Sequence, residues 1–246
     1  MTDNPADDLK PSFRGDVTVE LIKHTASDAD VLFAARVSTA GEQSLEELQK
    51  DPERSKGLIN YLMRDRHGSP FEHNSMTFFV SAPIFVFREF MRHRVGWSYN
   101  EESGRYRELE PVFYVPAEDR KLVQQGRPGK YEFVEGTPEQ HKTVTTAMEE
   151  SYRQSYAAYQ EMLKAGVARE VARATLPVGL FSSMYATCNA RSLMHFLGLR
   201  TQHELAKVPS FPQREIEMVA EKMEAEWAKL MPLTHAAYNA NGRVAP

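Results

Sequence analysis

The chain has 246 residues, of which 41% are hydrophobic and 26% are charged, and its formal net charge is -4. This length is enough for one large globular domain, and the slightly acidic balance argues against a protein that coats nucleic acid. A single cysteine excludes an intrachain disulfide, no run is apolar enough to cross a membrane, and the first residues lack the apolar stretch of a signal peptide. We therefore expect a cytoplasmic protein without membrane or nucleic-acid partners, with a mobile arm over residues 1–15 and one domain over residues 16–246.

The first third of the chain mixes strand and helix patterns. Apolar residues alternate over residues 16–22, which predicts a half-buried strand. A helix is expected to open at Ser27, and a second helix over residues 55–68 is expected to stop at Gly68. Residues 75–80, "SMTFFV", are rich in β-formers and favour another strand.

An apolar helix is predicted over residues 84–93, "IFVFREFMRH", because Pro83 suits a first helical turn. Residues three and four apart are neighbours on a helix, so one face is expected to carry Phe85, Arg88, Glu89 and Arg92. A helix that is otherwise buried must turn this polar stripe toward a cleft, a ligand or another chain.

The second half of the chain gives mostly helical patterns. Residues 105–116 favour a strand, and residues 116–136, rich in Pro, Gly and charge, predict a surface excursion. Thr137 and Gln140 form a capping box for a long helix that ends near Gly166. There follow a short helix stopped by Pro177, a strand over residues 180–188, a helix capped by Asn189 and a last amphipathic helix from Pro212 to about Met231. Helices and strands mix without regular βαβ alternation, which predicts an α+β fold with mixed helices and a central β-sheet.

Arginines are concentrated in the stretch "FREFMRHRVGWSYNEESGRYR", which contains Arg88, Arg92, Arg94, Arg105 and Arg107. A guanidinium group keeps its charge and presents a planar fork that matches phosphate. Backbone amides in the turn at Ser103 and Gly104 can also meet an oxygen anion. A solvated face with ordinary ion pairs is the alternative, but such a density beside an apolar helix favours a small anionic ligand.

Other polar residues have weaker patterns. His67, Glu72 and His73 could bind a metal, but their spacing fits no structural zinc site, so we expect no metal. Arg191 and His195 share a helical face. The chain contains no Gly-rich phosphate loop, so a dinucleotide would not bind on a Rossmann turn.

Several blocks together resemble one enzyme family. The segment "RHRVGWSYNEESGRYR" is similar to the signature of the flavin-dependent thymidylate synthases, in which R-H-R is followed by seven or eight residues and Ser. Eight residues separate Arg94 from Ser103 here, so the segment has one residue more than the commoner form, near Trp97. The other blocks occur in the family's order: "FAARVS", "LINYLM" with "HGSPFEH", "PIFVFREFMRHR", "GVAREVARATLP" and "NARSLMHFLGLR".

The resemblance implies an α+β, single-domain fold of the thymidylate synthase-complementing type, with residues 16–246 as the catalytic domain. It implies conversion of dUMP to dTMP with methylenetetrahydrofolate as carbon donor, FAD as redox cofactor and NADPH as reductant. It also implies a homotetramer whose active sites lie between subunits.

The resemblance also implies roles for individual residues. By matching blocks, the FAD contacts are expected to be Ser69, Arg92, His93, Arg94, Glu101, Asn189, Arg191 and His195. The dUMP contacts are expected to be Glu89, Arg92, Glu101, Glu102, Ser103, Gly104, Arg105, Arg173 and Arg200. Arg200 matches the residue that favours ionisation at N3 of the uracil ring and is the expected catalytic group.

Two functions of other classes remain alternatives at this point. An RNA-binding module would use Trp97, Tyr99 and Tyr106 as stacking platforms among the arginines, although the net charge of -4 counts against it. A nucleotide sensor without catalysis would bind dUMP but no flavin. Cys188, the only cysteine, is expected to be a packed apolar side chain rather than a nucleophile.

Overall fold

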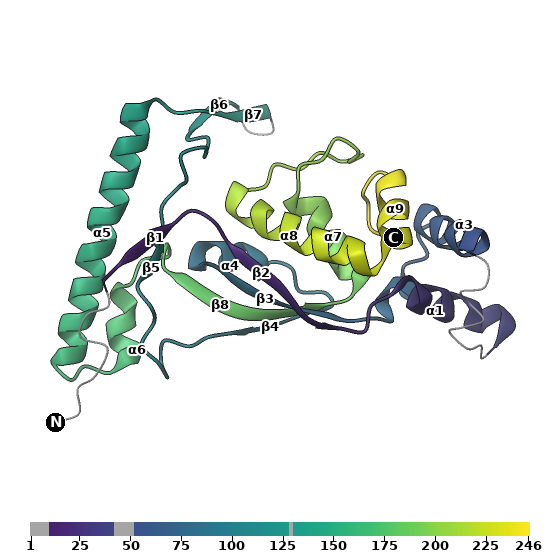
Figure 1. Cartoon of the computed structure of the whole chain (residues 1–246), viewed down its shortest axis with the longest axis horizontal. Helices are drawn as coiled ribbons and strands as arrows, with labels where there is room; N and C mark the ends of the chain where they lie inside the picture. Colours follow the sequence, from purple (N-terminus) through teal and green to yellow (C-terminus); the bar gives the residue numbers. More distant parts are fainter. Residues whose placement is uncertain (1–9, 42–51, 128–129) are drawn as a thin grey trace. The chain divides into compact units, whose positions relative to one another are not determined.

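The computed structural model describes residues 10–41, 52–127 and 130–246 (Figure 1). Residues 1–9 of the expected N-terminal arm lie outside the described residues. Of the rest of that arm, Ser12–Arg14 form strand β1, which pairs in parallel with β5, Val112–Tyr114. No helix among the described residues is both long and apolar enough to span a bilayer.

The structure confirms the α+β class. A four-stranded sheet has the order β2-β3-β8-β4, formed by Thr18–His24, Met76–Pro83, Phe181–Cys188 and Trp97–Glu101 (Figure 1). The helices of the described residues are α1 (Asp28–Ala40), α3 (Pro52–Arg64), α4 (Ile84–Phe90), α5 (Pro138–Lys164), α6 (Arg169–Ala172), α7 (Ala190–Arg200), α8 (Arg214–Leu230) and α9 (Pro232–Ala240), with 3-10 turns η2 (Ser69–Glu72) and η3 (Arg173–Thr175).

The chain divides into two compact units. Unit 1 contains the residues up to Asp16, Ser81–Arg88 and Glu101–Ser183, and unit 2 contains Val17–Val80, Glu89–Asn100 and Met184–Pro246. The expectation of a single catalytic domain over residues 16–246 stays a prediction.

The core of unit 1 forms around α5. Tyr152, Tyr156 and Tyr159 recur at helical spacing and are buried against Phe113 and Leu180. Thr137 and Gln140 close the predicted capping box, with Thr137 N donating to Gln140 Oε1 at 2.8 Å. The helix therefore begins where the sequence predicts, and it buries a face of three tyrosines.

The core of unit 2 forms where α8 packs on β2, α7 and α9. Trp227 and Tyr238 are fully buried, with ring centroids 5.8 Å apart in an edge-to-face arrangement. Burial of a large apolar side chain contributes about 1.5–3 kcal/mol to the free energy of folding. This core supports α7, which carries several of the predicted site residues.

Three sequence predictions about element boundaries are wrong. The second helix stops at Arg64 rather than at Gly68, because Arg66 takes the left-handed conformation (φ 63°) and His67 N donates to Leu62 O at 2.9 Å. The helix predicted over residues 84–93 ends at Phe90, so Arg92 does not extend the helical stripe.

In residues 105–116, only Val112–Tyr114 form a strand, because the residues after Ser103 turn: Tyr106 N donates to Ser103 O at 3.0 Å. The excursion at 116–136 contains an antiparallel pair, β6 (Val123–Arg127) and β7 (Lys130–Val134).

Candidate functional site

A pocket of about 460 Å³ lies beside the N-terminal half of α7 in unit 2. Its lining comes from η2, from the loop between α4 and β4, from the first residue of β4, and from α7 with its N-cap: Glu72, His93, Arg94, Val95, Gly96, Trp97, Asn189, Arg191, Ser192 and His195. Two guanidinium groups, two imidazoles and an indole therefore face one cavity. Such a set suits an anionic ligand with a planar ring.

The cap of α7 forms one wall of this pocket. Asn189 Oδ1 accepts from Ser192 N at 2.8 Å, as the sequence predicts for the cap. Ser192 Oγ then donates to Val95 O at 3.0 Å, which joins the loop to the helix. Gly96 has φ 69°, and a Cβ there would lie 2.1 Å from Ser192 Oγ. The loop before Trp97 therefore makes a tight turn that only glycine fits.

Arg191 is held in place on two sides. Its Nη1 donates to Glu72 Oε1 at 2.5 Å, and its Nε donates to Pro246 O at 2.6 Å. Gly68 packs directly on the guanidinium group, since a Cβ at Gly68 would lie 2.6 Å from Arg191 Cζ. Arg94, in contrast, is exposed and forms no ion pair with any residue that the structure describes. The guanidinium group of Arg191 is therefore fixed in place, whereas that of Arg94 is available to an anionic ligand.

His93 connects the pocket to Arg200. Arg200 Nε donates to His93 Nε2 at 3.1 Å, and Arg200 Nη1 donates to Glu89 Oε2 at 2.5 Å. A further bond runs from Arg200 Nη2 to Glu89 O at 3.3 Å, and the Arg200 side chain is only 18% exposed. Burial raises the pKa of Glu89, while the charge of Arg200 opposes the shift. The guanidinium group is thus oriented by a carboxylate on one edge and an imidazole on another.

Aromatic packing keeps His93 in position. Its ring meets Phe196 edge to face at a centroid distance of 4.8 Å, and Tyr99 OH donates to His93 O at 2.7 Å. Trp97 stacks on Tyr99 at 5.7 Å. Trp97 therefore lines the pocket, whereas Tyr99 packs against Trp97 and bonds the backbone of His93, so Tyr99 is not a free stacking platform.

The protonation of His93 makes folding depend on pH. Burial, together with the charge of Arg200, lowers the pKa of His93 to about 4. The unfolded chain takes up a proton near pH 6.5, so between pH 6.5 and 4 it binds a proton that the folded protein does not. We expect the free energy of unfolding to fall as pH falls through this window, with no contribution from His93 above it.

The measurement is urea unfolding of the wild-type protein and of His93→Gln at pH 7, 5.5 and 4.5. The variant should lose less stability on acidification than the wild type. His195 shifts in the same direction, because burial also lowers its pKa, so some pH dependence should remain. An identical loss in both proteins would contradict a neutral His93.

Of the remaining predicted residues, Ser69 begins η2 and Arg92 follows α4, both in unit 2. The others lie in unit 1: Glu101 ends β4, residues 102–105 follow it, and Arg173 begins η3. Ser103 Oγ accepts from Arg105 N at 3.3 Å, which closes the turn. Gly104 is buried, and a Cβ there would lie 3.0 Å from Leu109 Cδ1 and 3.4 Å from Arg173 Cδ. The stem of Arg173 therefore packs next to the turn that carries Arg105.

Two acidic side chains accompany these arginines. Arg105 Nε donates to Glu170 Oε2 at 3.0 Å, with both side chains about half exposed. Such a surface pair contributes little to stability, so Arg105 can exchange this partner for an anionic ligand. Glu101 accepts from Ser182 Oγ at 2.9 Å. Burial raises the pKa of Glu101, and the hydrogen bond from Ser182 opposes the shift.

The predicted residues thus fall into distinct groups. The pocket brings together five of the expected FAD contacts: His93, Arg94, Asn189, Arg191 and His195. Ser69, Arg92 and Glu101 do not line it. Among the expected dUMP contacts, Glu89, Arg92 and Arg200 belong to unit 2, whereas Glu101, Glu102, Ser103, Gly104, Arg105 and Arg173 belong to unit 1.

Sequence reasoning missed some pocket residues. Glu72 drew attention only as a possible metal ligand, yet its carboxylate holds Arg191. Ser192 follows Arg191 in the "NARS" block and gave no separate signal, although its hydroxyl binds the facing loop. Among the described residues, no three His, Cys, Asp or Glu side chains come together in a way that could hold a metal ion.

Cys188 is buried with 3% of its surface exposed. It is in phase with Met184 and Ala186 on the buried face of β8, and burial raises the pKa of its thiol well above the usual range. A thiol that resists ionisation in this way is a poor nucleophile.

Comparisons with known proteins show the family of this chain. The family model described as "Thymidylate synthase complementing protein" matches residues 20–233. A flavin-dependent thymidylate synthase of Streptomyces avermitilis is 87% identical over 246 residues, which is 100% of both chains. One from Tropheryma whipplei (strain TW08/27) is 56% identical over 239 residues, covering 97% of this chain and 98% of the relative.

A solved structure is also similar over nearly the whole chain. The UMP/dUMP methylase PolB from Streptomyces cacaoi, bound with 5-Br dUMP, has a TM-score of 0.89 at 56% sequence identity and covers 95% of this chain and 99% of its own. Because the family model spans most of the sequence and the relatives match along their full length, the chain belongs to the thymidylate synthase complementing protein family, the flavin-dependent thymidylate synthases.

Proposed function

We propose that this protein is a flavin-dependent thymidylate synthase that methylates C5 of the uracil ring of dUMP to give dTMP. Methylenetetrahydrofolate donates the carbon, and NADPH reduces a bound FAD. The observation that carries the proposal is the hydrogen bond between Arg200 and His93, because it joins the expected catalytic arginine to the pocket expected to hold the flavin. Relatives up to 87% identical bear the same name.

The pocket residues fit a phosphorylated flavin. Arg94 and Arg191 supply positive charge for phosphate, and Trp97 offers an aromatic surface for a planar ring. The full proposed set of FAD contacts is Ser69, Arg92, His93, Arg94, Glu101, Asn189, Arg191 and His195. When bound, the flavin supplies the hydride that completes the new methyl group.

Arg200 is the proposed catalytic residue. A pyrimidine must gain electron density at C5 before it can take up a one-carbon unit. A guanidinium group held against N3 and a neighbouring carbonyl stabilises negative charge on the ring. Glu89 and His93 fix the orientation of that group before the substrate arrives, so little reorganisation is needed.

The dUMP phosphate is proposed to bind in the turn after β4, with Arg105 and Arg173 as its cations and Ser103 and Gly104 as backbone contacts. Glu89, Arg92, Glu101, Glu102 and Arg200 are the other proposed dUMP contacts, with Arg200 addressing N3 of the uracil ring. We further propose that the enzyme acts in the cytoplasm as a homotetramer with active sites between subunits. The support for the tetramer is membership of the family.

The experiment that tests the function is dTMP formation from dUMP, with single omissions of FAD, NADPH and methylenetetrahydrofolate. Each omission should abolish product when the protein has first been freed of bound flavin. UMP belongs in the assay as a competitor, because PolB is described as a UMP/dUMP methylase and is 56% identical. Purified protein that binds dUMP but forms no methylated product with all components present would contradict the proposal.

Arg105→Ala and Arg173→Ala are expected to weaken dUMP binding ten- to a hundredfold, because a hydrogen bond to a charged group is worth about 1.5–3 kcal/mol. FAD affinity should change little, since neither residue lines the pocket at α7. Calorimetric titration of each variant with dUMP checks this. Arg153→Ala is a matched control on α5, since it removes an exposed arginine that pairs with Glu149 at 2.6 Å. Unchanged dUMP affinity in both site variants would remove them from the phosphate site.

A further inference from the structure

Helix α7 carries the largest group of proposed site residues, with Arg191 near its first turn and Arg200 as its last residue. Residues 241–246, here called the C-terminal segment, contact this helix at both ends. The backbone of the segment also passes close to α7 at Gly198, since a Cβ on Gly198 would lie 3.3 Å from Arg243 O. Tyr238, just before the segment, donates to Met194 O at 3.0 Å.

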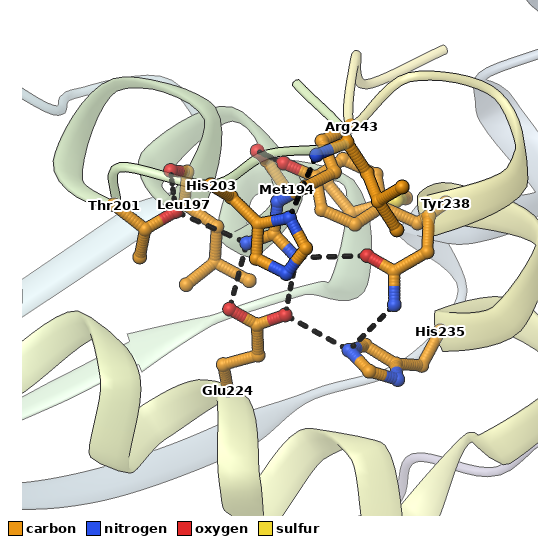
Figure 2. A network of polar contacts seen from close by, with 10 residues as sticks. Met194, Leu197, Thr201, His203, Glu224, His235, Tyr238 and Arg243 are labelled. Atoms are coloured by element: carbon orange, nitrogen blue, oxygen red, sulfur yellow. Dashed lines mark hydrogen bonds and ion pairs between the residues drawn. The ribbon is translucent and has the colours of Figure 1, made fainter. Parts of the chain in front are cut away.

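Arg243 forms the centre of a buried polar network in this segment (Figure 2). Its guanidinium group donates to both carboxylate oxygens of Glu224 on α8, at 2.6 and 2.7 Å, and to Asn239 Oδ1 at 2.8 Å. Only 1% of the Arg243 side chain is exposed. His235 bonds the same carboxylate at 2.8 Å.

The Arg243–Glu224 pair is ionised in the folded protein. Burial alone would raise the pKa of Glu224, but the hydrogen bonds from Arg243 and His235 outweigh it and lower the pKa to about 2. Breaking a buried pair of this kind leaves an uncompensated charge, which is strongly unfavourable. The network therefore anchors the C-terminal segment, through Arg243, to α8 and α9.

Thr201 is the point where this anchor meets α7. Arg243 Nη2 donates to Thr201 Oγ1 at 3.0 Å (Figure 2). Thr201 Oγ1 donates in turn to Leu197 O at 2.8 Å, and Ser210 Oγ donates to Thr201 O. Thr201 is 5% exposed and directly follows Arg200. Glu89 holds the side chain of Arg200. Arg243 and Ser210, which lie outside the proposed site, hold the residue that follows it.

The other end of the segment holds Arg191. Pro246 O accepts from Arg191 Nε at 2.6 Å. Arg66 Nη1 donates to Val244 O at 3.0 Å and to Ala245 O at 2.8 Å, which ties the segment to the turn after α3. One short stretch of chain therefore contacts the residue after Arg200 and the guanidinium group of Arg191.

We propose that the C-terminal segment is a positioning element of the active site, in which Arg243 sets the position of Arg200 through Thr201 and residues 244–246 set the position of Arg191. None of these residues touches the reacting atoms. The inference rests on the proposed roles of Arg200 in catalysis and Arg191 in flavin binding. A substitution that breaks the contact at Thr201 should therefore lower kcat, whereas one that frees residues 244–246 should weaken flavin binding.

The sharpest test at the Arg200 end is Thr201→Val against Thr201→Ser. Valine keeps the shape but removes the hydroxyl that accepts from Arg243, whereas serine keeps it. We expect Thr201→Val to lower kcat about tenfold, which corresponds to about 1.4 kcal/mol, with flavin affinity within about twofold of wild type. Thr201→Ser should restore kcat. Hydrogen exchange should become faster at the amides of residues 197–201 in the valine variant only.

The matched control is Thr77→Val. It removes another partly buried hydroxyl contact, the 2.9 Å bond to Thr187 in the sheet, and should lower stability while leaving kcat and exchange at α7 unchanged. At the other end, Arg66→Ala should weaken flavin affinity about three- to tenfold. Because Thr201 remains in place, exchange at residues 197–201 should stay as in wild type.

Wild-type kcat in Thr201→Val would overturn the positioning of Arg200, and unchanged flavin affinity in Arg66→Ala would overturn that of Arg191. A fall in kcat for Thr77→Val equal to that for Thr201→Val would show a general stability effect and would also overturn the inference. If the wild-type protein forms no dTMP, the proposed function fails, but exchange at α7 and flavin affinity still decide whether the segment anchors the helix.

Discussion

Replacing Arg200 with lysine is expected to lower kcat for dTMP formation about a hundredfold in a protein that stays folded. Lysine keeps the positive charge and can still pair with Glu89, but it loses the planar fork that reaches His93, Glu89 and a substrate together. Removing one oriented donor to a developing negative charge typically costs a factor of about 10²–10³ in kcat. The assay is dTMP formation at saturating dUMP, with folding checked by thermal melting.

Cys188→Ser is the contrasting variant. The thiol is buried and its pKa is raised, so it is not expected to act as nucleophile, and the variant should keep most of the kcat. Some stability should be lost, because a hydroxyl replaces a thiol in an apolar site. A folded Cys188→Ser protein that binds FAD and dUMP but forms no dTMP would make the thiol the nucleophile and would contradict the role given to Arg200.

Gly96→Ala is expected to weaken flavin binding about thirty- to a hundredfold. Alanine at φ 69° costs about 1–2 kcal/mol, and its Cβ would lie 2.1 Å from Ser192 Oγ. The loop must move away from α7 and give up the 3.0 Å bond from Ser192 to Val95, worth about another 1 kcal/mol. In the variant, part of the free energy of flavin binding is used to return the loop at Val95 and Gly96 to its wild-type position, so the affinity falls.

The measurement is fluorescence titration of the variant protein with FAD. Gly57→Ala is the control, because Gly57 lies inside α3 with no atom within 4 Å of an added Cβ. That change should raise stability by about 0.5–1 kcal/mol and leave flavin affinity unchanged. Tight FAD binding by Gly96→Ala would mean that the loop at Val95 and Gly96 is not a wall of the flavin site.

Local signals were sufficient to predict most helix starts. Ser27, Thr137 and Asn189 each precede their helices, as a capping residue should, because the bonds that a cap makes lie within four residues. The helix stop at Gly68 was predicted wrongly because Arg66 takes the left-handed position that glycine usually fills.

Elements that depend on distant partners were harder to predict. β4, Trp97–Glu101, was not predicted: Trp97 and Tyr99 alternate with Ser98 and Asn100, but the stretch is short and its strand character depends on pairing within the sheet. α9, Pro232–Ala240, was missed as a separate helix after Met231. The α+β class did not depend on these details, because the mixture of patterns was clear without them.

The site shows the same division. The family signature located His93 and Arg94, and the "NARSLMHFLGLR" block located Asn189, Arg191 and His195; all five line one pocket. No local pattern joined Arg200 to His93, 107 positions apart, or Arg243 to Thr201, 42 positions apart. These contacts follow only from the packing of α7 against the rest of unit 2.

The visible absorbance spectrum of the purified protein shows whether the pocket at α7 holds a flavin that is used for reduction. We expect a flavin spectrum, present on purification or after addition of FAD and removal of the excess. The absorbance should bleach when NADPH is added without oxygen. A colourless protein that fails to take up FAD, or a bound flavin that NADPH leaves unchanged, would contradict this expectation.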